Sequence, residues 1–160
     1  MDVLGLDHIY VSVSDFARAE RFYDGVMDAL GFRKGDKQIA GEPHCHYFNR
    51  ALQYTIRPAR STAPHDPYAP GLHHVCFQVA DTATVDEAYR RLRALGVDAT
   101  APRRYPEYNP EYYATFLHDP DGLRLEIVSR TSYRDEIVRR WKDLRVFLNP
   151  LAALHEREGR

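Results

Sequence analysis

The sequence predicts an α+β fold in which two tandem β-α-β-β-β modules form a curved mixed sheet, followed by a C-terminal helix. Three observations support this prediction. A strand-like phrase containing histidine occurs twice, as "DHIYVSVSD" and as "HHVCFQVAD". Each copy is followed by an amphipathic helical segment that stops at a glycine, and each helical segment is followed by short strand-like segments. Such a repeat indicates a duplicated structural unit.

Length and composition limit the class of protein. A chain of 160 residues can bury one core but is too short for two ordinary domains. The net charge of −1 gives no basic surface, so we expect no nucleic-acid partner. No apolar run is long enough to predict a transmembrane helix, and the N-terminus lacks a signal-peptide pattern, so we expect no membrane partner. The two cysteines form no disulfide framework, which favours the cytoplasm.

The two helices have recognisable limits. The first is expected to begin after Asp15 and to stop at Gly31, and the second to begin after Asp81 and to stop at Gly96. Aspartate is a preferred N-cap, and glycine suits the position just after a helix. Apolar side chains recur between these limits with helical spacing. They are Phe22, Tyr23, Val26, Met27 and Leu30 in the first helix, and Val85, Ala88, Tyr89, Leu92 and Leu95 in the second.

The remaining strands and the boundaries follow from turn residues and apolar runs. The expected strands cover residues 32–39, 44–49 and 51–57 in the first module and 97–101, 112–118 and 123–128 in the second. We expect a single domain over residues 1–130, made of module one (4–57), a proline-rich linker (58–71) and module two (72–129). Residues 131–160 are expected to form an amphipathic helix and a tail, with Ile137, Trp141, Leu144 and Leu148 on one stripe.

Strand alternation points to a candidate site. His8 and His74 begin the first strand of each module, on a face more polar than the fully apolar face opposite, and Glu126 has the same orientation in the last strand. If the two polar faces meet, the three side chains converge. A lone histidine at a strand start is usually a packing or capping residue. Two at repeat-equivalent positions, with a carboxylate that is costly to bury unpaired, favour a metal site.

The pattern resembles the vicinal oxygen chelate superfamily, which includes glyoxalase I, fosfomycin-resistance thiol transferases, extradiol dioxygenases, methylmalonyl-CoA epimerases and bleomycin-resistance proteins. The resemblance covers residues 4–129 and rests on "DHIYVSVSD", "FYDGVMDALGF", "LHHVCFQVAD" and "FLHDPDGLRLEIV". It implies that His8, His74 and Glu126 bind one divalent metal ion per chain (Mn, Fe, Ni, Co or Zn), with Glu126 also catalytic. It further implies a homodimer that acts on a small molecule chelating the metal through neighbouring oxygens, by lyase, isomerase, thiol-transferase or dioxygenase chemistry.

The sequence departs from glyoxalase I at one position. In that enzyme the last strand of the first module also supplies a carboxylate, but here Thr55 aligns with Glu126. A threonine hydroxyl is a poor metal ligand and a poor base, so glyoxalase I itself is disfavoured. The candidate substrate-contacting residues are Tyr10, Thr55, Arg57, Cys76, Tyr108, Tyr113 and Arg124.

Several alternatives stay open at the level of the sequence. A binding protein that sequesters an aromatic molecule, like the bleomycin-resistance members, would suit the tyrosine-rich segment 103–113, which otherwise covers the core as a surface loop. His44 and His46 form either a second metal pair or, as we favour, ordinary polar residues of an edge strand. Cys76 is a small pocket-lining residue or a reactive thiol, and the former is favoured. The C-terminal helix is interpreted as packing in the core or a dimer rather than as a lid.

Overall fold

The structure, a computed structural model, describes residues 3–61 and 63–142 and confirms the α+β class. The elements are β1 (His8–Val13), α1 (Phe16–Ala29), β2 (Arg33–Ile39), β3 (Glu42–Phe48), β4 (Gln53–Pro58), β5 (His74–Gln78), α2 (Thr82–Ala94), β6 (Arg103–Arg104), β7 (Tyr113–His118), β8 (Arg124–Ser129) and α3 (Thr131–Arg139). Within the described residues, none of these helices is long and apolar enough to cross a membrane.

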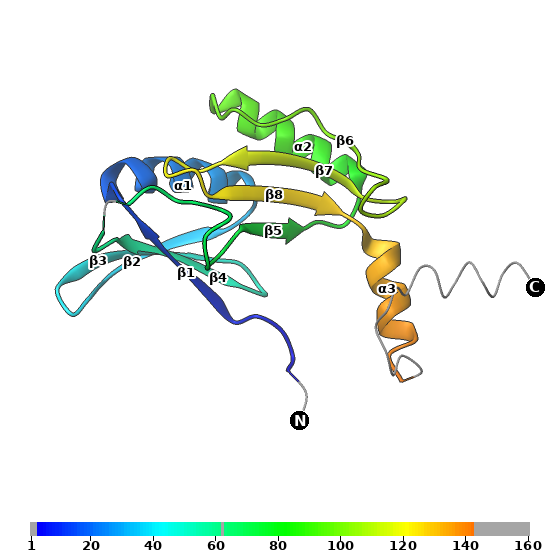
Figure 1. The fold of residues 1–160 in the computed structure, drawn as a ribbon, viewed down its shortest axis with the longest axis horizontal. Helices are drawn as coiled ribbons and strands as arrows, with labels where there is room; N and C mark the ends of the chain where they lie inside the picture. The colour runs from blue at the N-terminus through cyan, green and yellow to red at the C-terminus, as the bar shows by residue number, and fades with distance from the viewer. Residues whose placement is uncertain (1–2, 62, 143–160) are drawn as a thin grey trace, which may run out of the picture.

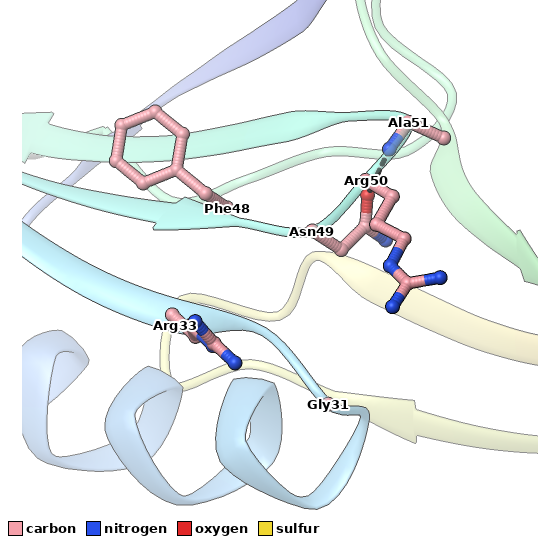
Figure 2. Close-up of a pocket in the computed structure, with 6 residues that line it drawn as sticks. All are labelled: Gly31, Arg33, Phe48, Asn49, Arg50 and Ala51. Atoms are coloured by element: carbon pink, nitrogen blue, oxygen red, sulfur yellow. Dashed lines mark hydrogen bonds between the residues drawn. The ribbon is translucent and has the colours of Figure 1, made fainter.

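The strands form two four-stranded mixed sheets, one in each β-α-β-β-β module, which confirms the predicted duplication. The strand order is β1-β4-β3-β2 in the first sheet and β5-β8-β7-β6 in the second. In each sheet the first strand pairs in parallel with the last strand of its module, and the other pairs are antiparallel. Figure 1 shows the two groups of strands lying apart. Among the described residues β1 and β5 are therefore edge strands.

The sheets are separate because both turn their apolar faces toward one shared core that also contains α1 and α2. Tyr23 of α1 links the modules, since its hydroxyl lies 3.0 Å from the Tyr54 hydroxyl and donates to Asp119, between β7 and β8, at 2.8 Å. Phe77 of β5 packs its ring against Phe32 and Tyr54 of the first module. The polar face of each sheet consequently faces away from the shared core.

Both helices begin and end where the sequence predicts. Asp15 caps α1 by accepting a hydrogen bond from the backbone N–H of Arg18, and Asp81 caps α2 in the same way. Gly31 and Gly96 follow the helices with φ angles of +79° and +77°, a conformation that side chains disfavour. The buried residues are Ala19, Tyr23, Val26 and Met27 in α1 and Val85, Ala88 and Leu92 in α2.

Two expected elements differ. Residues 97–101 form no strand. The backbone N–H of Ala99 donates to the carbonyl of Val97, and Pro102 has no N–H, so regular pairing is interrupted. Within this segment, Thr100 is the residue that hydrogen-bonds to β7. The C-terminal helix covers Thr131–Arg139, and only Ile137 of its residues is buried. Trp141 is mostly exposed, and the predicted stripe positions 144 and 148 lie outside the described residues.

Candidate metal and substrate site

Glu126 is the most deeply buried of the predicted site residues that carry a charge. Only 1% of it is exposed, although it lies on the polar face of the second sheet, beside Cys76 of β5 and Phe116 of β7. The Tyr112 hydroxyl donates to Glu126 Oε1. The other oxygen, Oε2, lies 3.7 Å from His74 Nε2 and 3.8 Å from Arg124. A buried carboxylate requires such partners or a cation.

His74 presents Nε2 toward Glu126 because its other ring nitrogen is engaged. His74 Nδ1 lies 2.7 Å from His73 Nδ1. When His74 donates in that contact, the Nε2 lone pair is free to bind a cation. Burial lowers the pKa of His74, and the charges of Arg124 and His73 act in the same direction, against the opposing effect of Glu126. The neutral imidazole, which is the metal-binding form, is therefore favoured.

His8 lies apart from these two residues within one chain. Its ring is exposed, contacts the Tyr10 ring at 5.5 Å and has Nδ1 2.8 Å from Asp7. Across residues 3–61 and 63–142, His8, His74 and Glu126 do not form a group whose ligand atoms all lie within 4.8 Å of one another. The structure thus brings His74 and Glu126 together and leaves His8 on the other sheet.

The ligand atoms of a different group, Glu20, Asp36 and Cys45, do all lie within 4.8 Å of one another. The Lys34 ammonium already lies among these acidic side chains, 2.6 Å from Glu20 and 3.6 Å from Asp36. Burial and the hydrogen bond to Glu20 raise the pKa of Cys45 to about 12, which disfavours the thiolate that a metal needs. Lys34 therefore satisfies this cluster, which we interpret as structural.

The polar face of the first sheet is rich in histidine. Thr55 is fully buried, and its hydroxyl lies 2.9 Å from His46 Nδ1 and accepts from Gln53 Nε2 at 2.8 Å. His44 and His46 are both buried on β3, which lies between β4 and β2. Our prediction of an edge strand is wrong, because β3 is an interior strand of the first sheet.

The predicted substrate-contacting residues divide into two groups. Tyr10 lies on the polar face of the first sheet beside Thr55, and Cys76 and Arg124 lie on that of the second. Arg57 is ion-paired with Glu42, and Arg124 stacks on Phe116 at 4.1 Å. Cys76 is exposed within one chain, but desolvation by the surrounding atoms, followed by the nearby Glu126 charge, raises the pKa of its thiol to about 12, which disfavours a reactive thiolate.

Within the tyrosine-rich segment the expectation for Tyr113 is corrected. Tyr113 points to the opposite face of β7, where its hydroxyl donates to Asp86 of α2 at 2.8 Å. Tyr112, which we did not predict, is the residue that contacts Glu126. Tyr108 is largely exposed and packs its ring against Tyr112 at 5.2 Å. The segment therefore covers Glu126 through one tyrosine and leaves another at the surface.

These features define a class of protein: a duplicated β-α-β-β-β fold with a histidine and a buried glutamate on the polar face of its second sheet. Comparison with known proteins agrees with this class. The chain belongs to the Glyoxalase/Bleomycin resistance protein/Dioxygenase superfamily, whose family model matches residues 5–127. This membership confirms the resemblance on which the metal-ligand expectation was based.

Individual relatives give further context. The uncharacterized protein YaeR of Escherichia coli K12 is 31% identical over 133 residues, covering 75% of this chain and 92% of YaeR. A glyoxylase/bleomycin resistance protein/dioxygenase domain from Frankia sp. EAN1pec has a TM-score of 0.66 at 21% identity, covering 80% and 98% of the two chains. A mutant of the FosX fosfomycin resistance protein from Listeria monocytogenes, complexed with Mn(II) and 1S,2S-dihydroxypropylphosphonic acid, has a TM-score of 0.62 at 21% identity, covering 84% and 98%. Both structures share the fold.

Proposed function

We propose that this protein is a divalent-metal enzyme acting on a small substrate that chelates the metal through two neighbouring oxygens. The observation that carries the proposal is the pairing of His74 Nε2 with the buried Glu126 carboxylate at 3.7 Å. A carboxylate with 1% exposure and an imidazole of lowered pKa form a donor pair that a divalent cation would satisfy. The FosX relative, whose complex contains Mn(II) and a vicinal diol, supports this choice.

The residues that would hold the metal are His74, Glu126 and His8. Two imidazoles and one carboxylate on one side of a metal leave open positions for a bidentate substrate. The bound cation would act as a Lewis acid that stabilises negative charge on a substrate oxygen. Tyr112, now hydrogen-bonded to Glu126, would keep one carboxylate oxygen oriented while the other faces the metal.

We further propose that His8 joins the site from a second copy of the chain. His8 and His74 begin β1 and β5, the edge strands of the two sheets, and the polar faces of both sheets turn away from the shared core. Two copies that pair through these edges would place the first sheet of one copy opposite the second sheet of the other. The expected homodimer would thus complete the metal site.

A binding protein for aromatic molecules is the second candidate. The exposed ring of Tyr108, which packs against the buried rings of Tyr105 and Tyr112, favours it, since it offers a flat apolar surface. Such a protein would not need the buried carboxylate, so we prefer the enzyme.

Turnover assays test the proposal. Protein loaded separately with Mn(II), Fe(II), Ni(II) or Zn(II) would be supplied with the hemithioacetal of methylglyoxal and glutathione, with an epoxide and a thiol, or with catechol and dioxygen. We expect turnover of at least one substrate class, lost on Glu126→Gln and retained in Glu87→Gln, a change at a partly exposed position of α2. Turnover that is equal in Glu126→Gln and wild type would refute the enzyme assignment.

A further inference from the structure

His46 occupies the centre of the polar face of the first sheet. In the strand register it lies opposite Thr55, which in turn lies opposite Tyr10, and Gly35 is its neighbour on β2. Its ring is stacked between His44 at 6.1 Å and Phe48 at 5.9 Å, and only 7% of the residue is exposed. The orientation of the imidazole is therefore fixed by packing on both sides.

The hydrogen-bond partners of His46 favour one tautomer. Gln53 Nε2, which carries only donors, lies 3.0 Å from His46 Nδ1, and the Thr55 hydroxyl lies 2.9 Å from the same nitrogen. When the Gln53 amide donates to Nδ1, that nitrogen accepts and the ring proton resides on Nε2. That Nε2 is buried and has no hydrogen-bond partner among the described residues. Buried polar groups are almost always paired, so an unpaired donor here indicates a missing acceptor.

The position of His46 relative to the proposed metal ligands suggests what that acceptor is. Gln53 lies directly opposite His8 in the register, and the Tyr10 ring contacts both His8, at 5.5 Å, and His46, at 6.3 Å. His46 and His8 therefore lie two strands apart on the same polar face, with Gln53 and Tyr10 between them.

The internal repeat gives a second argument. Thr55 and Glu126 occupy equivalent positions, each on the last strand of a module and opposite the third residue of its first strand. Their neighbours on the adjacent strand are His46 in the first module and Phe116 in the second. The Thr55 hydroxyl of the first module therefore corresponds to the Glu126 carboxylate of the second, and the His46 imidazole corresponds to the Phe116 ring.

We propose that His46 contacts the substrate, donating a hydrogen bond from Nε2 to an oxygen of the chelating molecule, with Gln53 and Thr55 as positioning residues. This inference rests on the proposed function. A neutral imidazole donor polarises a carbonyl or stabilises an enolate oxygen without adding a full charge. Burial lowers the pKa of His46, and the charges of His44 and Lys37 add to this effect against the opposing charge of Asp36, so the ring stays neutral at pH 7.

Oxalate is a suitable probe, because it chelates a metal through two oxygens and leaves two others as acceptors. Its affinity for Mn(II)-loaded protein would be measured by calorimetry in wild type, His46→Phe, His46→Gln and, as a matched control, His44→Phe. His46→Phe copies the residue of the second module and keeps the ring stack. We expect it to weaken oxalate binding at least tenfold while Mn(II) affinity stays within twofold. His46→Gln, which retains an N–H donor, and His44→Phe should stay within threefold of wild type.

A second measurement needs no metal. Long-range proton–nitrogen NMR of the metal-free protein is expected to show His46 protonated at Nε2 and not at Nδ1, with the other tautomer gaining population in Gln53→Leu. Oxalate affinity that is unchanged in His46→Phe, or a wild-type ring protonated at Nδ1, would overturn the inference. Failure of wild-type protein to bind any of Mn(II), Fe(II), Ni(II), Co(II) and Zn(II) would instead refute the proposed function, and the NMR result would still decide the tautomer.

Discussion

At the scale of single residues, Thr55 and Glu126 show how one repeat can carry two kinds of polar site. Both are buried beside the first strand of their module. Glu126 is surrounded by a phenol, an imidazole and a guanidinium, which suits a charged group. The Thr55 hydroxyl is hydrogen-bonded to an amide and an imidazole, which suits a neutral group. The two modules would therefore make different contributions to a shared site.

The buried His46 should make stability depend on pH. Its pKa in the folded protein lies below the ordinary 6.5, so the unfolded chain binds the proton more readily. The stabilisation is present above about pH 6.5 and is lost as the pH falls toward the folded pKa, by at most about 1.4 kcal/mol per pH unit. Urea unfolding at pH 7.5 and 5.5 is expected to show a smaller loss for His46→Phe than for wild type. Equal losses would contradict the prediction.

The residues of the site were only partly predictable. His8, His74 and Glu126 stood out because a repeat aligns them, and Tyr10, Cys76 and Arg124 followed from alternation. Tyr112 could not be distinguished from Tyr113, because alternation applies only after a strand has begun, and β7 begins at Tyr113. The roles of Gln53 and His46 depend on the register between strands, which one chain's sequence does not reveal.

At the scale of elements, the hydrogen-bonded group of Tyr23, Tyr54 and Asp119 joins α1, β4 and the β7–β8 turn. Asp119 also accepts from the backbone N–H groups of Asp121 and Leu123, and burial raises its pKa. A buried carboxylate that loses one donor becomes costly. Asp119 therefore fixes a turn and connects the two modules at once.

Tyr23→Phe tests this connection. We expect it to lower the free energy of unfolding by about 1–3 kcal/mol, because it removes a donor from a buried acceptor. Tyr113→Phe is the control, since its hydroxyl also donates to a carboxylate, Asp86, but lies closer to solvent. Chemical denaturation would measure the free energy of unfolding of wild type and both variants. A loss for Tyr23→Phe no larger than for Tyr113→Phe would show that the group contributes little.

The elements themselves were largely predictable. Helical spacing with aspartate before and glycine after the helix located α1 and α2 to within a residue or two. The order of the strands in each sheet was not predictable, because the identity of a strand's neighbours depends on long-range packing. This is why β3 was taken for an edge strand.

At the scale of the whole molecule, two polar faces that turn away from one core explain why the proposed ligands are divided. His74 and Glu126 meet on the second sheet, whereas His8 lies on the first. A dimer in which these faces meet would bury both and join the edges of β1 and β5. The outward faces would then be the interior of a two-chain site.

Subunit mixing tests this arrangement. His8→Ala and Glu126→Gln chains, each expected to lose metal binding alone, would be co-expressed and their heterodimer isolated. If each metal site is shared between two chains, one of the two sites in the heterodimer keeps all three ligands. About one tightly bound Mn(II) per heterodimer is then expected. A site within one chain would leave both sites damaged, and no tight binding would be recovered.

The central claim, a divalent metal at Glu126, is tested most directly by titrating metal-free protein with Mn(II). Wild type is expected to bind about one ion per chain. Glu126→Gln should bind at least tenfold more weakly, a loss of about 1.4 kcal/mol or more, while Glu87→Gln should match wild type. Wild-type protein that binds neither Mn(II) nor Fe(II), Ni(II), Co(II) or Zn(II), or a Glu126→Gln variant that binds Mn(II) as tightly as wild type, would contradict the account.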